Sequence, residues 1–238
     1  MRFLLMLACG LASACSAADW AEVVIPSGTG VVERSLGTAA KTLARAYAEA
    51  TGTRLRVVPA EKHTPSAKAI LIGRAAAEKA GFDLSGFKAM ENVVAEKDGN
   101  VYLFGNDREG RRGAKAWQFC VLPSVRAVTR FMEGRMNVRF LMPGRIGRTV
   151  PRGEVRIEQG LYRRHNPTQE AGMGRDFEMM FDIANNNVGA GAYHSYGGHS
   201  YEPAVPADRY FKDHPEYFGL LAGKRVYMKH GSILCISN

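Results

Sequence analysis

The stretch from Asn100 to Pro151, NVYLFGNDREGRRGAKAWQFCVLPSVRAVTRFMEGRMNVRFLMPGRIGRTVP, decides the fold of this chain. It opens with a compact apolar run, Val101 to Phe104, which is typical of a buried strand. Pro123 suits the first turn of a helix and Gly134 the position just past its end. Between them, apolar residues recur at helical spacings, at Val125, Val128 and Met132. A second strand is predicted at Val138 to Leu141, so strand, helix and strand form a crossover that lays both strands in one sheet.

The residues before this stretch supply more elements of the same kinds. Ser35 is predicted to cap a helix over Leu36 to Ala50, and a short alanine-rich helix ends at Gly81. Asp98-Gly99 is a good turn pair for a hairpin. Further strands are predicted at Ala21–Ile25, Arg54–Val58, Ala69–Ile72 and Lys88–Glu96. The order of elements up to about Val150 predicts a complete α/β domain over residues 19–152.

The character of the chain changes after Pro151. A short strand is predicted at Val155–Ile157, and it can pair with an edge of the first domain. A second short strand is predicted at Gly160–Arg164, and a helix follows over Asp176–Asn187. This alternation resembles the start of a (β/α)8 barrel over residues 153–238, but such a barrel needs about 250 residues. The last strand, Ile233–Ile236, is apolar and is followed only by Ser237-Asn238. We therefore expect a barrel truncated after its first few units.

Residues 1–18 have the anatomy of a secretory signal peptide: Arg2, an apolar run from Phe3 to Leu7, and small residues up to Ala18. Cleavage after Ala18 predicts export to the periplasm or the extracellular space. The alternative is a lipid anchor at Cys15, since a small-residue run that ends in Cys is the lipoprotein pattern. No other apolar segment is long enough to span a bilayer.

Two cysteines, Cys120 and Cys235, remain after the signal peptide, which excludes a disulfide scaffold and leaves one bridge or two buried thiols as alternatives. The formal net charge is +9. Such a balance suits a polyanion, and the alternative, which we favour over any one specific partner, is a solvated basic surface. Nucleic acid is not the expected partner, because the chain is predicted to be exported and holds no nucleic-acid recognition motif.

Three segments carry a family resemblance. Phe131-Met132-Glu133 followed by Val138 to Gly144 (VRFLMPG) resembles a signature of the N-terminal domain of secreted glycoside-hydrolase-like proteins, many of them labelled only as a domain of unknown function. These proteins are related to the α-glucuronidases of glycoside hydrolase family 67. His214 to Leu220 (HPEYFGL), then Gly223-Lys224-Arg225, is similar to the block that starts their barrel domain. Leu234 to Asn238 (LCISN) looks like a later element of the same group. Arg145 departs from the pattern, which has an acidic residue there.

The resemblance implies a β-hexosaminidase-domain-2-like α/β domain followed by the barrel. Glycoside hydrolysis needs two carboxyl groups, and in family 67 these lie on later barrel strands, so no catalytic residue is assigned. Asp213 and Glu216, which flank Pro215, are interpreted as features of a helix end and a turn. No cofactor is implied.

The candidate substrate-binding residues lie in the glycine- and tyrosine-rich loop HSYGGHSY, at a position that corresponds to the end of a barrel strand. They are His194, Tyr196, His199 and Tyr201, with Asn238 at the same rim. Imidazoles donate to sugar hydroxyls and aromatic rings stack on sugar faces; the alternative is that the histidines only satisfy backbone groups. His194 and His199 have no third metal ligand at a clear spacing, so a metal site is not predicted.

Arginines in Arg108–Arg112 and Gly144–Arg148 can bind sugar carboxylates by bidentate pairing or form a solvated face. Trp117 is either a stacking platform or part of the core. Two readings of function follow. One is the N-terminal part of an exported glycoside-hydrolase-like protein that acts on or binds polysaccharide and is not catalytic by itself. The other is a non-catalytic carbohydrate-binding or accessory module for anionic glycans.

Overall fold

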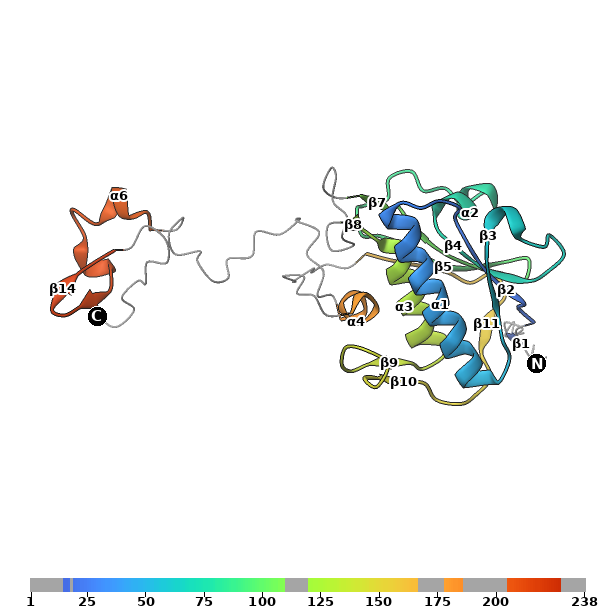
Figure 1. The fold of residues 1–238 in the computed structure, drawn as a ribbon. Coiled ribbons are helices and arrows are strands. Elements are labelled where there is room, and N and C mark those ends of the chain that lie inside the picture. The colour runs from blue at the N-terminus through green and yellow to red at the C-terminus, as the bar shows by residue number, and fades with distance from the viewer. Residues whose placement is uncertain (1–14, 18, 110–119, 167–177, 186–204, 228–238) are drawn as a thin grey trace, which may run out of the picture. The chain divides into compact units, whose positions relative to one another are not determined.

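The computed structural model of the protein describes residues 15–17, 19–109, 120–166, 178–185 and 205–227. The chain divides into two compact units, Met1–Ala192 and Tyr193–Asn238. The first unit holds a mixed α/β fold around one large sheet, and the predicted α/β class is confirmed at this level (Figure 1).

The centre of the first unit is a six-stranded sheet with the order β12-β5-β6-β4-β2-β3. Four of its strands run parallel: β2 (Glu22–Ile25), β3 (Arg56–Pro59), β4 (Ala69–Ile72) and β6 (Asn100–Gly105). The hairpin strand β5 (Asn92–Lys97) is antiparallel to β6, and β12 (Tyr162–His165) is antiparallel to β5. The predicted Asp98-Gly99 turn joins β5 to β6, and both residues have a positive φ.

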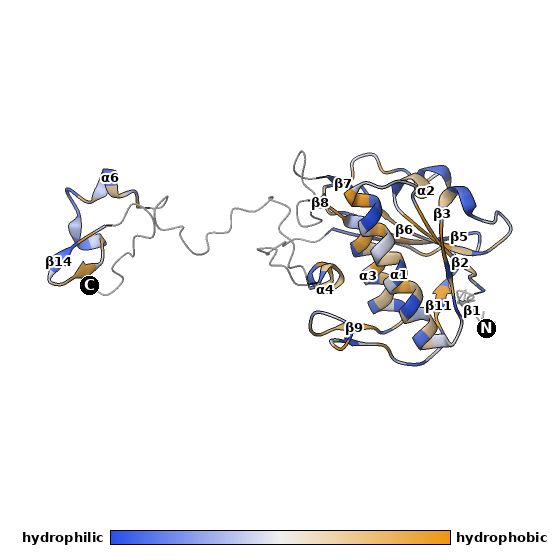
Figure 2. Cartoon of the chain, viewed as in Figure 1, coloured by the Kyte–Doolittle hydropathy of each residue, from blue (hydrophilic) through white to orange (hydrophobic). Residues whose placement is uncertain are grey.

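Helices cover both faces of this sheet, as Figure 1 shows. Helices α1 (Val31–Thr51) and α3 (Pro123–Arg135) pack on one face, over a core that includes Leu36, Leu43, Val128 and Phe131. The shorter α2 (Arg74–Lys79) lies on the other face with Tyr102 and Phe104 of β6. Because neighbouring residues of a strand point to opposite faces, the apolar run Val101–Phe104 serves both cores at once. Figure 2 shows this as apolar strands between helices that mix apolar and polar residues.

The crossover predicted for the Asn100–Pro151 stretch is only half correct. Its first strand and helix exist as β6 and α3, but the second strand, β9 (Arg139–Phe140), pairs with β10 (Arg148–Thr149) in a separate two-stranded sheet. The physical reason is that both edges of β6 are taken, by β4 on one side and by the hairpin strand β5 on the other. No position beside β6 is left for a further strand.

Two predicted helix ends are also corrected. Ser35 lies inside α1, where its hydroxyl donates to the carbonyl oxygen of Val31 at 2.7 Å, so it does not cap the helix. Buried Val31 extends the apolar face and brings the helix start forward to Gly30. Gly134 lies inside α3, and Asn137 takes the left-handed conformation after the helix instead, with φ of 52°.

The sheet extends beyond residue 152, where sequence placed the start of the second domain. Strand β12 joins β5 because the loop before it is held in place: the Gly160 amide donates to the carboxylate of Glu96, and the Glu96 amide donates to the Leu161 carbonyl at 2.8 Å. Strand β11 (Arg156–Glu158) pairs with β1 (Cys15–Ala17), which lies within the predicted signal peptide. Helix α4 (Met179–Ala184) packs on α3. Strands β7 (Arg108–Glu109) and β8 (Cys120–Val121), and the 3-10 turn η1 (Ala60–Lys62), are the other elements among the described residues of this unit.

The described part of the second unit, residues 205–227, consists of short elements. Helix α6 (Ala207–Tyr210) is followed by the 3-10 turn η3 (Pro215–Tyr217) and by a hairpin of β13 (Leu220–Leu221) and β14 (Lys224–Arg225). Phe218 is buried and has an edge contact with Phe211, at 5.2 Å between ring centroids. Glu216 lies in η3 and pairs with the His214 ring at 3.0 Å, within a turn. The barrel stays a prediction.

Candidate functional site

The substrate-binding residues predicted from sequence lie outside the described residues. These are His194, Tyr196, His199, Tyr201 and Asn238. Trp117 and two arginines of the Arg108–Arg112 group, Arg111 and Arg112, lie outside as well. Of the three remaining arginines considered as anion ligands, Arg108 is exposed on β7, Arg145 is exposed with its guanidinium 3.6 Å from Glu49, and Arg148 is half-buried on β10. None of these three lines either of the two cavities described below.

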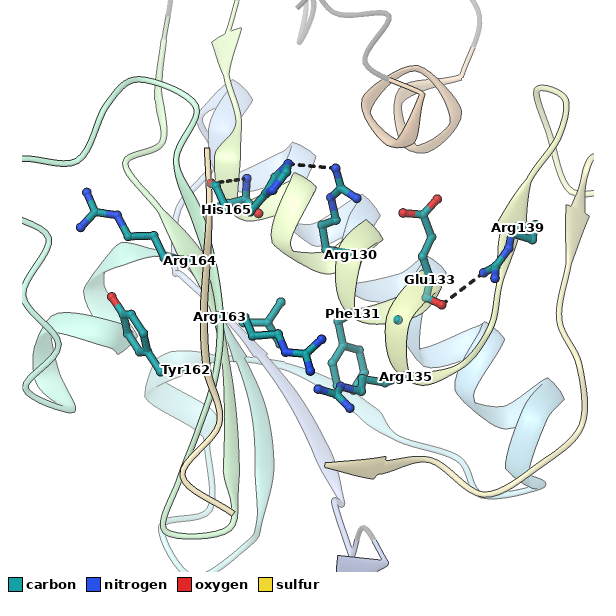
Figure 3. Close-up of a pocket in the computed structure, with 12 residues that line it drawn as sticks. Arg130, Phe131, Glu133, Arg135, Arg139, Tyr162, Arg163, Arg164 and His165 are labelled. Carbon is teal, nitrogen blue, oxygen red and sulfur yellow. Dashed lines mark hydrogen bonds between the residues drawn. The ribbon is translucent and has the colours of Figure 1, made fainter. Parts of the chain in front are cut away.

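A different set of basic residues does converge. They line a pocket of about 750 Å³ between α3, β9 and the β5–β12 edge of the sheet (Figure 3). The residues that line it are Asn92, Val94, Arg130, Phe131, Glu133, Gly134, Arg135, Arg139, Tyr162, Arg163, Arg164 and His165. Five of these are arginines and one is an acid, so the lining is strongly basic.

The alternation of β12 decides which of its side chains face α3. His165 is paired with Asn92 and Arg163 with Val94, a member of the α1–α3 core, so Arg163 and His165 lie on that face. Tyr162 and Arg164 point to the other side of the strand, as Figure 3 shows. There the guanidinium of Arg164 lies 4.2 Å from the ring centroid of Phe87 and pairs with Glu91.

Helix α3 supplies the second wall. Arg130, Glu133 and Gly134 lie near the end of this helix, outside its buried face. Arg130 and Gly134 are exposed and Glu133 is half-buried, whereas Phe131 is buried. Arg135 belongs to the last turn, and its Nη1 donates to Oε1 of Glu158 at 2.8 Å while Nη2 lies 2.7 Å from Oε2. This ion pair anchors β11 to the end of α3 and takes Arg135 out of the set that can receive a ligand.

Three arginines of the pocket, Arg130, Arg139 and Arg163, have no carboxylate within ion-pair distance among the described residues. Arg130 donates to Nε2 of His165 at 2.9 Å, and Arg139 donates to the backbone carbonyls of Val138 and Glu133 at 2.9 and 3.2 Å. A guanidinium has five N–H donors, so both keep donors for a ligand. The exposed Arg163 contributes its charge to the field at Glu158.

Two further titratable groups of the pocket, Glu133 and His165, have pKa values shifted toward their neutral forms. Burial raises the pKa of Glu133, and the charges of Arg130 and Arg139 only partly oppose this. Burial also lowers the pKa of His165, helped by the positive charges of Arg130 and Arg126. A neutral His165 can accept the bond from Arg130 at Nε2 while Nδ1 carries the proton. Arginine therefore dominates the charge of the lining, with five guanidinium groups against one carboxyl group.

The arrangement suits recognition of an anion. Planar guanidinium groups match carboxylates and sulfates in a bidentate manner, and they remain charged at any pH of biological interest. The negative end of the α3 dipole, equivalent to about half a charge, lies at this end of the helix and opposes an anion. Three unpaired guanidinium groups outweigh it. No cluster of metal-ligating side chains occurs in the described parts of the chain.

Neither a comparison with models of known protein families nor a search of curated proteins finds a match for this chain. The helices of the described segments all fall short of the length and apolar character that a bilayer crossing requires.

Proposed function

We propose that the protein binds anionic glycans through the pocket formed by Arg130, Arg139 and Arg163. The observation that carries this proposal is the convergence of these three guanidinium groups from α3, β9 and β12, none of which has a carboxylate within ion-pair distance in the described structure. A pocket of about 750 Å³ falls within the range of about 300–1,000 Å³ typical of small-ligand sites. It accommodates one or two sugar residues of a longer chain.

The acidic group of the glycan is the part that the pocket recognises best. A uronic-acid carboxylate can pair in a bidentate manner with one guanidinium and receive a further bond from a second. Asn92, which lines the same pocket, offers an amide of the kind that binds sugar hydroxyls. Neutral sugars would leave the arginines without compensation for their lost water, so we expect the protein to discriminate by charge.

We further propose that this binding belongs to an exported protein of the glycoside-hydrolase-like group that the three sequence blocks resemble. In that reading the six-stranded unit is the β-hexosaminidase-domain-2-like domain, and the second unit begins the barrel. Supporting this are the α/β organisation of the first unit and the secretory pattern of residues 1–18. The proposal is for binding. No catalytic residue is assigned.

The test is calorimetric titration of the protein with a trimer of galacturonic acid and, separately, with the neutral trimer of xylose. We expect saturable binding of the acidic trimer only, weakening as salt is raised from about 0.05 to 0.5 M because charge pairing is screened. Removing one charged hydrogen-bond donor costs about 1.5–3 kcal/mol, so Arg163→Ala should weaken binding at least tenfold.

The matched control is Arg54→Ala, which removes the same charge from an exposed position outside the pocket. If Arg54→Ala weakens binding as much as Arg163→Ala, only the overall charge matters and the pocket has no role. Equal affinity for the acidic and the neutral trimer would also refute the proposal.

A further inference from the structure

A second cavity, of about 590 Å³, lies on the other face of the sheet. It is bounded by β2, β4 and β6 below, by η1 and the turn after it on one side, and by α2 on the other. Its lining is mainly apolar and contains four polar side chains, those of His63, Lys79, Asn100 and Tyr102. The apolar residues of the lining are Val24, Ile25, Pro26, Ala60, Pro65, Leu71, Ile72, Ala75, Ala76 and Ala80. A mostly apolar cavity with a few convergent polar groups is the usual form of a small-molecule site.

The most distinctive feature of this cavity is the support beneath His63. Nδ1 of the imidazole lies 2.7 Å from Oε2 of Glu22, whose side chain is completely buried at the start of β2. The same carboxylate receives Arg56 and both the amide and the hydroxyl of Thr64. Burial favours its protonated form, but these bonds outweigh that effect and hold the pKa of Glu22 below its usual value. Glu22 is therefore ionised and can only accept.

This arrangement fixes the chemistry of His63. Because an ionised carboxylate has no proton to donate, Nδ1 of His63 must carry the hydrogen of their shared bond. The ring orientation is set by Glu22, and Nε2 is left as the atom that His63 can offer to a ligand. An imidazole held in one tautomer by a buried carboxylate is suited to accept a hydrogen bond from a hydroxyl group.

The other polar groups of the lining indicate the rest of the ligand. Lys79 is exposed at the end of α2 and forms no hydrogen bond or ion pair with any described residue, so its ammonium group can pair with an anion. Burial raises the pKa of the Tyr102 hydroxyl, so this phenol stays neutral and presents an aromatic face. Among the described residues that line the cavity there is no carboxylate, since Glu22 contacts His63 but is not part of the wall.

We propose that this cavity binds a small aromatic acid that carries a hydroxyl group, with the ring among the alanines of α2 and Tyr102, the hydroxyl donating to His63, and the carboxylate paired with Lys79. The site is separate from the arginine pocket and does not depend on the function proposed for it. It adds a second ligand, of a different chemical class, to the same unit.

The experiment uses 4-hydroxybenzoate as the probe, with affinity measured by ligand-observed NMR. Saturable binding to the wild-type protein is expected, with losses of about tenfold in His63→Ala and several-fold in Lys79→Met. The control Lys41→Met removes an exposed lysine of α1 outside the cavity and should bind as the wild type does. Ala76→Phe fills the cavity from α2 and should abolish binding.

Two further probes, each lacking one of the two polar groups of the ligand, test the assignment. Benzoate lacks the hydroxyl, so its affinity should not change in His63→Ala. The neutral 4-hydroxybenzyl alcohol lacks the carboxylate, so its affinity should not change in Lys79→Met. The proposal is overturned if the wild type shows no saturable binding of 4-hydroxybenzoate, or if Ala76→Phe binds it normally. Loss of binding in Arg163→Ala but not in Lys79→Met would place the ligand in the arginine pocket, and would equally overturn it.

Discussion

Replacing Glu22 with Gln should cost the first unit a substantial part of its stability. The Glu22 side chain has no exposed surface and accepts four hydrogen bonds from three residues, Arg56, His63 and Thr64. A glutamine keeps the shape but turns one accepting oxygen into a donor that faces other donors. Losing one partner of a buried charged network costs about 3–5 kcal/mol. Because Arg56 is 68% exposed and can return to water, we expect about 3 kcal/mol.

The same substitution should change how stability depends on pH. Burial alone would raise the pKa of Glu22, but the bonds from His63 and Thr64 and the charge of Arg56 lower it overall. A carboxylate whose folded pKa is lowered stabilises the fold above its unfolded pKa, about 4.3, and this contribution is lost as the pH falls through the folded value. Glu22→Gln should lack this part of the acid-induced loss.

Urea unfolding followed by far-UV circular dichroism, at pH 7 and at steps down to pH 3, measures both effects. Arg56→Ala is the matched control, since it removes only the exposed partner and should cost less than about 1 kcal/mol. If Glu22→Gln unfolds within 1 kcal/mol of the wild type at pH 7 and keeps the same acid limb, then the buried network contributes no net stability and the reasoning fails.

Three other predictions concern different parts of the first unit. In Gly105→Ala the new Cβ would lie 2.5 Å from Pro123 and 2.6 Å from the Glu91 carbonyl oxygen, so thermal unfolding should show a loss of at least about 1–3 kcal/mol. Burial raises the pKa of Asp107 to about 7, against the bonds from Ser124, so wild-type stability in urea should fall as the pH rises from about 4 to 7, whereas Asp107→Asn should remove that slope. In the arginine pocket, burial raises the pKa of Glu133, so wild-type affinity for the galacturonic acid trimer should increase as falling pH protonates this carboxyl group. Calorimetry of Glu133→Gln should show tighter binding than the wild type at neutral pH and a smaller increase on acidification, since His165 is then the group of this pair left to titrate.

Much of the sheet could be predicted from sequence, because its central strands are short apolar runs buried on both faces. Ala69–Ile72 matches β4, and the predicted run Val101–Phe104 matches β6 (Asn100–Gly105) apart from one residue at each end. Their order in the sheet could not be read in the same way. Pairing depends on which edges are free, and the Asp98-Gly99 hairpin places β5 beside β6 before the chain reaches β9. A local pattern cannot show that an edge is already occupied.

The arginine pocket could not be predicted from sequence, for a related reason. A basic cluster is visible in sequence only among neighbouring residues, whereas Arg163 joins Arg130 and Arg139 only when β12 pairs with β5. One signal was available. Successive side chains of a strand point to opposite faces of a sheet. A strand over Gly160–Arg164 therefore predicts that Arg163 and Arg164 face opposite sides, so that one of them faces the layer formed by the two long helices.

The opposite orientations of Arg163 and Arg164 distinguish a ligand site from a solvated surface. On its side of the sheet, Arg164 contacts the ring of Phe87 and pairs with the carboxylate of Glu91. Arg163, one residue earlier, lines the pocket together with Arg130 and Arg139 and has no carboxylate within ion-pair distance among the described residues. Like charges held together cost free energy unless something compensates them. An anion from outside the chain would supply this compensation. The comparison of Arg163→Ala with Arg54→Ala tests whether the pocket binds one.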